Sequence, residues 1–269
     1  MNNRAYVGRS KEIKVSELTH GVDIDFALPN DLSFFLPYLP YYVRETLEIG
    51  GQAYVSQSPS GTALGIFIYD DLEKTGTIFA RSREVFDHFY RLKPFDSLFA
   101  ELKTEHDCET YDIYNIDIEK LAFAHSFKHE ISVARESQLH EIEQFMVLTH
   151  PGINRKWVGV ALKDGEKCFI AKFEDEIAGV GWLSIVDGIG RLHSLFVRPR
   201  FRRIGIGEDI LYARLFWLKA MRTRSAFSEI SRENPSSSKI AVKGGMNVLG
   251  QVFQYYGKDI RRKTGMLRW

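Results

Sequence analysis

Residues 195–211, LFVRPRFRRIGIGEDIL, lead from an apolar run through a basic loop with two glycines into a helical pattern. The apolar run predicts the end of a strand, and the acidic residues Glu208 and Asp209 are typical of the first turn of a helix. Backbone N–H groups at a helix start have no partner within the helix, so they can bind an anion. Gly205 and Gly207 allow a ligand to approach these groups closely, and the four arginines of the loop add positive charge. The stretch therefore predicts a phosphate-binding turn between a strand and a helix.

Two other phosphate-binding loops do not fit these residues. A dinucleotide fingerprint requires a third glycine at the position of Ile210. A P-loop requires Gly-Lys followed by Ser or Thr, and this sequence occurs nowhere in the chain. The motif that remains is Arg202-x-x-Gly205-x-Gly207.

Hydrophobic periodicity and turn residues predict further elements on both sides of the loop. Before it, the patterns indicate strands at 131–136, 167–174, 176–186 and 190–197, and a helix at 137–149. The last three strands are joined by short turns, which predicts an antiparallel meander. After the loop, the patterns indicate a helix at 208–224, a strand at 226–232, a short helix at 237–245, and a closing hairpin formed by 248–256 and 264–269.

Together with these elements, the motif resembles the signature of the GNAT superfamily of N-acetyltransferases. That signature is Gln/Arg-x-x-Gly-x-Gly/Ala, and it lies between the fourth strand and the following helix. The chain matches it with Arg202, Gly205 and Gly207, after Pro199 and Phe201 in the same loop. The resemblance covers residues 131–269 in the order of elements. It implies an α+β fold with a mixed, mostly antiparallel sheet flanked by helices, and it implies acetyl-CoA as co-substrate with no metal.

The resemblance also implies which residues contact coenzyme A. The end of the strand would face the pantetheine and the acetyl carbonyl, and a strand-end amide there can stabilise an oxyanion. The loop would hold the pyrophosphate through its backbone amides, and an Asn after the next strand would contact the cofactor from the other side. The cofactor-binding residues expected on this basis are Leu195, Phe196, Val197, Arg202, Arg203, Ile204, Gly205, Ile206, Gly207, Asn234 and Ser237.

Transfer to an amine requires a base, because a lysine-like amine is mostly charged near pH 7. His193 lies four residues before Val197, so both share one face of the predicted strand. The run LHSLFV resembles the corresponding strand of arylalkylamine N-acetyltransferases, in which a His at this place takes part in proton removal. The alternative is a strand histidine bonded to a neighbour. Many relatives carry Glu two residues earlier, where this chain has Arg191.

The general acid is harder to assign. The family's Tyr would fall near Ala241, where the sequence offers no proton donor. Tyr255 of the predicted closing hairpin is the candidate replacement, and Tyr256, Ser237 and Ser238 are alternatives. A thiolate is a tolerable leaving group, so the missing Tyr does not exclude activity.

The first half of the chain echoes the second. Residues 61–71 resemble 176–188, and residues 75–82 stand where 190–197 stand, but no glycine pair precedes the helix that follows. We therefore expect two similar domains in tandem. The first, 1–128, would be a degenerate GNAT-like domain without a pyrophosphate loop, and the second, 129–269, would be the acetyl-CoA-binding catalytic domain.

Composition limits the remaining classes of function. The 36 Lys and Arg against 35 Asp and Glu give a net charge of +1, which argues against nucleic-acid binding. The apolar segment 34–43 is too short for a membrane span, and Cys108 and Cys168 form no CxxC pair, so we expect a cytoplasmic protein. The leading hypothesis is an N-acetyltransferase acting on a small-molecule or peptide primary amine. The alternative is a non-catalytic, acyl-CoA-binding regulatory protein, and a homodimer is among the open oligomeric states.

Overall fold

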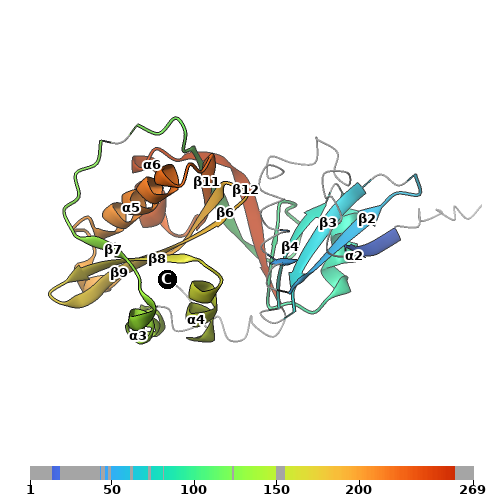
Figure 1. The fold of residues 1–269 in the computed structure, drawn as a ribbon. Helices are drawn as coiled ribbons and strands as arrows, with labels where there is room; N and C mark the ends of the chain where they lie inside the picture. Colours follow the sequence, from blue (N-terminus) through green and yellow to red (C-terminus); the bar gives the residue numbers. More distant parts are fainter. Residues whose placement is uncertain are drawn as a thin grey trace, which may run out of the picture. The chain divides into compact units, whose positions relative to one another are not determined.

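The computed structural model describes residues 14–18, 43, 46, 47, 50–60, 63–71, 74–80, 82–122, 124–149 and 155–257 (Figure 1). The chain divides into two compact units. The first contains Met1–Thr110 with Gln251–Arg268, and the second contains Tyr111–Gly250. Among the described residues, no helix combines the length and apolar character needed to cross a membrane.

The second unit is built on a mixed sheet, as the sequence predicts. Its antiparallel meander consists of β7 (Ile131–Val133), β8 (Lys167–Phe173), β9 (Glu176–Val186) and β10 (Ile189–Val197). β11 (Ser225–Ser231) lies parallel to β10, and β6 (Cys108–Asp117) pairs antiparallel with β11. The mixed, mostly antiparallel character expected from the sequence is therefore confirmed.

Helices cover both faces of this sheet (Figure 1). The 3-10 turn η3 (Glu136–Gln138), α3 (Leu139–Thr149) and α4 (Arg155–Lys163) belong to one side. α5 (Ile206–Ala220) and α6 (Pro235–Lys243) belong to the other. The sequence predicts all of these helices except α4.

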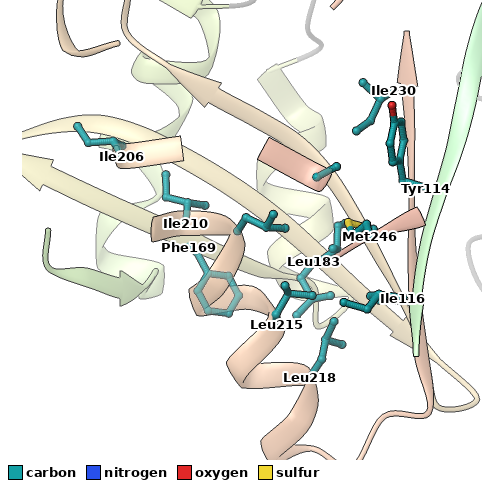
Figure 2. Close-up of a cluster of buried hydrophobic side chains, with 14 of the residues drawn as sticks. Tyr114, Ile116, Phe169, Leu183, Ile206, Ile210, Leu215, Leu218, Ile230 and Met246 are labelled. Atoms are coloured by element: carbon teal, nitrogen blue, oxygen red, sulfur yellow. The ribbon is translucent and has the colours of Figure 1, made fainter. Parts of the chain in front are cut away.

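Each face has its own apolar core. Figure 2 shows the core under α5, where Ile210, Leu215 and Leu218 gather with Phe169 and Leu183 of the sheet. The opposite core joins α3 and α4 to β8 and β9, and it consists of Ile142, Phe145, Met146, Val158, Ala161, Cys168, Ile170, Ile177, Val180 and Trp182. Trp182 is fully buried there, so it is a core residue of the sheet.

Two glycines of β9 allow α5 to pack close to the sheet. A Cβ atom at Gly181 would lie 2.5 Å from Ile210 Cγ2, and one at Gly179 would lie 2.9 Å from Ile206 Cγ2. Both distances are shorter than any normal carbon contact, and the Cγ2 atoms belong to β-branched side chains with few rotamers. The pattern Gly-x-Gly in β9 thus sets the distance between the sheet and the helix that follows the basic loop.

The first unit repeats this strand order. β1 (Lys14–Leu18), β2 (Gln52–Gln57), β3 (Ala63–Asp70) and β4 (Thr75–Ala80) are antiparallel neighbours. A crossover through α2 (Arg83–Leu92) leads to β5 (Ser97–Ala100), which is parallel to β4. β12 (Asn247–Tyr256) then pairs antiparallel with β5. An aromatic core that includes Phe67, Phe86, Phe89 and Tyr255 fills the space beneath α2.

Each unit is completed by a strand from the other half of the sequence. Phe253–Tyr256 of β12 pair with Ser97–Ala100 in the first unit, and Tyr111–Asp117 of β6 pair with β11 in the second. The compact units therefore differ from the predicted division at residue 128. Of the predicted closing hairpin, residues 253–256 pair with β5, and the other arm, 264–269, lies outside the described residues.

We predict that Gly181→Ala destabilises the second unit by about 1–3 kcal/mol, because the new methyl group overpacks the contact with Ile210. The measurement is the midpoint of chemical denaturation. Gly159→Ala is the matched control, since a Cβ at this position of α4 meets its nearest atom at 3.9 Å and alanine favours a helix. Equal midpoints for Gly181→Ala and the wild type would contradict the close packing.

Candidate functional site

β10 separates from its parallel neighbour before it reaches the basic loop. Its pairing with β11 joins Ile189–Arg191 to Ser225–Phe227 and does not continue along the described residues of the two strands. On the other side, the pairing with β9 is interrupted by a bulge between His193 and Phe196. Ser194 in this bulge has φ of 49°, which is uncommon for a residue with a side chain. The second half of β10 is thus splayed away from β11.

A buried arginine supports the bulge from the α5 side. Arg214 is 2% exposed, and its Nη1 donates to Trp182 O at 3.0 Å and to His193 O at 3.3 Å. These two carbonyls belong to residues that face each other across β9 and β10. Burial lowers the pKa of Arg214 to about 9, so the guanidinium remains charged at neutral pH. One cation therefore fixes both strands at the point where the bulge begins.

The turn after β10 exposes backbone donors in the way that the sequence predicts. A 3-10 turn, η4 (Pro199–Phe201), leads to Arg203 with φ of 68° and to Gly205 with φ of 103°. Gly205 is the N-cap of α5, and the first helical bond runs from Asp209 N to Gly205 O at 3.0 Å. The N–H groups of residues 206–208 precede this bond, so no carbonyl of the helix can accept from them. They form the donor set that an anion requires.

The charge of the loop is smaller than the sequence suggests. Arg198 and Arg200 both pair with the carboxylate of Glu176, the former at 3.2 Å. Arg202 Nε donates to Val197 O at 3.0 Å and thereby ties the loop to the end of β10. The expectation that all four arginines add charge at one point is corrected for Arg198 and Arg200, because a carboxylate of β9 neutralises part of their charge.

α6 forms the side of the site opposite β10. A Cβ at Gly207 would lie 3.0 Å from Ile240 Cδ1 of α6 and 3.6 Å from Val197 Cγ2 of β10, so a larger residue would require Ile240 to shift. Asn234 is the N-cap of α6, and its Oδ1 accepts from Ser237 N at 3.2 Å. Asn234 and Ser237, predicted cofactor residues, therefore lie together at the start of this helix.

His193 has a carboxylate partner that the sequence analysis missed. Its Nε2 lies 3.1 Å from Glu166 Oε2, and the two side chains are only 14% and 17% exposed. Burial acts to raise the pKa of Glu166, but the interactions with His193 and Arg191 outweigh it and hold this pKa below the ordinary carboxyl value. The strand register could have revealed the pair, because Glu166 lies two residues before Cys168, which faces Trp182, which faces His193.

The other ring nitrogen of His193 also has a partner. Nδ1 lies 3.2 Å from Ser194 Oγ, within the bulge. Arg191, at the position where many relatives carry Glu, pairs instead with Glu229 of β11 at 3.2 Å. The carboxylate beside His193 is therefore supplied from the start of β8 and not from β10 itself.

The surroundings of Tyr255, the predicted acid, indicate a structural role. It belongs to the first unit, where its ring is fully buried. Its hydroxyl donates to Leu102 O at 2.7 Å and accepts from Thr104 N at 3.0 Å. Burial raises the pKa of Tyr255, which further disfavours proton loss. We therefore give Tyr255 no catalytic role, and Ala241 is buried with no proton donor to offer.

A second cluster that the sequence analysis missed lies at the start of α5. The Asp209 carboxylate is 2% exposed and has His125 Nε2 and His129 Nδ1 each at 2.7 Å. It also accepts from the backbone N–H groups of Lys128 and His129 at 3.1 and 3.0 Å. Burial acts to raise the pKa of Asp209, but these hydrogen bonds outweigh it and lower the pKa below the ordinary value. The cluster fastens the segment before β7 to the first turn of α5, beside Gly205.

Two further observations concern potential metal ligands and thiols in the part of the chain that the structure describes. No group of three or more His, Cys, Asp and Glu side chains there is arranged to hold a metal ion. Burial raises the pKa of the Cys168 thiol far above its ordinary value, which makes it a poor nucleophile.

Comparison with known proteins agrees with this geometry. Residues 119–241 match the model of the Acetyltransferase (GNAT) family. A GNAT-family acetyltransferase from Colwellia psychrerythraea has a similar fold, with a TM-score of 0.57 at 14% identity over 91% of this chain and 100% of that one. A tandem GNAT protein from the clavulanic acid biosynthesis pathway gives 0.55 at 11% identity over 91% and 98%. A Drosophila protein gives 0.60 at 13% identity over 87% and 92%. No curated protein matches the chain.

We predict that Asp209→Asn lowers the free energy of unfolding by about 2–3 kcal/mol at pH 7, because an amide loses the charge-assisted bonds to both histidines. Since the folded pKa of Asp209 is lowered, its contribution is complete above the ordinary carboxyl pKa of about 4 and is lost as the pH falls through the folded value. The two proteins should therefore converge in stability under strong acid.

Chemical denaturation at neutral and acid pH measures this difference. Asp117→Asn is the control, because Asp117 is 44% exposed and pairs with an exposed Lys120, so its loss should cost less than about 1 kcal/mol. A variant Asp209→Asn as stable as the wild type at pH 7 would show that the cluster does not stabilise the fold.

Proposed function

Since the chain carries an acetyltransferase domain of the GNAT family over residues 119–241, we propose that it transfers an acetyl group from acetyl-CoA to a primary amine. The observation that carries this proposal is the separation of β10 from β11 after Arg191. It leaves the end of one strand and the start of α5 beside each other, with backbone groups outside regular pairing. The backbone N–H groups of the strand end suit the carbonyl of a thioester, and those of the helix start suit a pyrophosphate.

The residues present fit acetyl-CoA. The N–H groups at the start of α5 and the positive φ of Gly205 suit the pyrophosphate, and Arg203 is an exposed cation of the same turn. The splayed part of β10 suits the pantetheine and the acetyl carbonyl. On this reading the cofactor residues are Leu195, Phe196, Val197, Arg203, Ile204, Gly205, Ile206, Gly207, Asn234 and Ser237, while Arg202 supports the loop through Val197 O.

His193 is the proposed base. Imidazole is the side chain best suited to accept a proton near neutral pH, and Glu166 would stabilise the charged ring after that transfer. The acceptor would be a small-molecule or peptide amine, as the sequence analysis expects. The amine must reach the carbonyl in its neutral form, so a base beside the splayed strand serves the reaction directly.

The first unit supports a tandem arrangement of two GNAT-like domains, in which it would be a degenerate copy. Its strands follow the order of the second unit, with a helical crossover between two parallel strands. Residues 198–205 separate β10 from α5, whereas only residues 81 and 82 separate β4 from α2. Ser82 caps α2 with its side chain in place of a glycine turn. We therefore propose a scaffolding or acceptor-shaping role for the first unit and no pyrophosphate binding.

A regulatory protein that binds acyl-CoA without turnover is the second candidate. The buried Ala241 favours it, because this position provides no acid for the leaving thiolate. The pair formed by His193 and Glu166 favours the enzyme, since a binding module has no need of a buried base.

We predict that Gly205→Ala weakens acetyl-CoA binding at least about tenfold, because a side chain at φ of 103° distorts the turn that presents the helix amides. Calorimetric titration of acetyl-CoA measures the affinity. Gly188→Ala is the matched control: Gly188 also has positive φ, at 74°, but lies in the turn between β9 and β10. Equal binding by both variants would contradict the proposed pyrophosphate site.

We predict that His193→Gln lowers kcat about 100-fold or more without changing acetyl-CoA affinity by more than about twofold. The measurement is release of free thiol from acetyl-CoA with a primary amine that the wild type accepts. Binding without thiol release in the wild type, across a panel of amines, would favour the regulatory candidate.

A further inference from the structure

The two partners of His193 determine which of its nitrogens carries the proton. A carboxylate can only accept hydrogen bonds, and Glu166 Oε2 lies 3.1 Å from Nε2, so a neutral ring suits this neighbour when its proton is on Nε2. Nδ1 then has its lone pair available and accepts from the Ser194 hydroxyl at 3.2 Å. The order Glu166, His193, Ser194 thus runs from a nearly buried carboxylate to a hydroxyl, with the imidazole between them.

The bulge places this hydroxyl in the splayed part of β10. Ser194 and Leu195 lie between His193 and Phe196 in the bulge, and the φ of 49° at Ser194 departs from the strand conformation. Such a conformation costs energy and persists where surrounding contacts enforce it. Arg214 supplies one of these contacts by binding the carbonyl of the preceding residue, His193. In a regular strand, Ser194 and His193 would point to opposite faces of the sheet.

Given acetyl transfer as proposed above, we propose that Glu166, His193 and Ser194 form a proton relay with Ser194 Oγ as its contact to the amine. The amine nitrogen forms its bond to the acetyl carbon, and Ser194 takes a proton from that nitrogen while giving its own to His193 Nδ1. Glu166 stabilises the imidazolium that results.

The relay returns the proton when the C–S bond breaks. The electron pair of that bond leaves on sulfur, and the His193 proton passes through Ser194 to the thiolate. The products are then an amide and a thiol, with His193 neutral again and no proton exchanged with a separate acid. The relay therefore needs no proton donor at the position of Ala241.

Other charged groups surround the relay. Arg191 and its partner Glu229 belong to β10 and β11, and the Arg191 charge acts on Glu166. The Arg214 guanidinium reaches the His193 carbonyl from α5, and the Cys168 thiol belongs to the core that joins α3 and α4 to the sheet. Of these groups, Glu166 is the anion in direct contact with the ring, so its removal should have the largest effect on the basicity of His193.

The first test needs no acceptor amine. Nitrogen-15 NMR of the full chain identifies the His193 signals by their loss in His193→Gln and reports the tautomer. We expect a neutral ring protonated on Nε2 in the wild type and a mixture of tautomers in Glu166→Gln. Glu141→Gln is the matched control, because it removes an exposed carboxylate that pairs with Lys172. A wild-type ring protonated on Nδ1 would overturn the relay.

The second test measures kcat against pH with an accepted amine. Glu166→Gln should lower kcat about 10- to 100-fold and move the acidic limb to lower pH, because the imidazolium loses its anion. Glu166→Asp should restore part of the rate. Ser194→Ala keeps the Cβ and the backbone, and it should lower kcat about tenfold or more with the acidic limb in place and the KM for acetyl-CoA unchanged.

The outcomes separate the relay from the function on which it rests. Acetyl transfer by the wild type with unchanged kcat and pH profile in both Glu166→Gln and Ser194→Ala would overturn the relay alone. An acetyl group trapped covalently on Ser194 would also overturn it, since the serine would then be a nucleophile. Failure of the wild type to transfer acetyl to any amine would overturn both proposals, and retained acetyl-CoA binding would then leave the regulatory candidate.

Discussion

The candidate site depends on one interruption of a β-sheet. β10 leaves β11 after Arg191, and the bulge at Ser194 interrupts its pairing with β9. Backbone donors in a continuous sheet would be used up in the ladder. The interruption needs support, and the Arg214 guanidinium provides it by donating hydrogen bonds to the carbonyls of Trp182 and His193. Removing a cation from water is costly, so its complete burial beneath the bulge indicates how strongly this geometry is held.

The charged side chains around the loop fix its shape more than they add net positive charge. Glu176 forms ion pairs with Arg198 and Arg200, and Arg202 donates a hydrogen bond to the end of β10. Asp209 contacts two histidines of the segment before β7. These contacts are short and directional, and they leave the start of α5 with its own amides as the main source of positive potential. The basic loop is therefore a turn whose shape is fixed by its ion pairs and hydrogen bonds.

The two units share a strand order but differ in the connection that leads into the crossover helix. Both have a meander, a helical crossover and a parallel strand, and both are closed by a strand from the other half of the sequence. In the first unit Ser82 caps α2 directly after β4, whereas in the second an eight-residue turn at 198–205 precedes α5. The proposed anion site thus belongs to the unit in which this connection is longer and contains glycines.

The sequence by itself determined the meander, the position of α5, the glycine turn and the likeness to acetyltransferases, because these depend on residues close together in the chain. Periodicity over 176–186 and 190–197 and the spacing of Gly205 and Gly207 are local signals. Only the tertiary structure placed Glu166 against His193, Arg214 beneath the bulge and two histidines on Asp209. It also placed Tyr255 in the core of the first unit, where β12 pairs with β5. Such contacts join residues from 21 positions apart, as in Arg214 and His193, to 153 positions apart, as in Tyr255 and Leu102, and no local pattern specifies which distant partners meet.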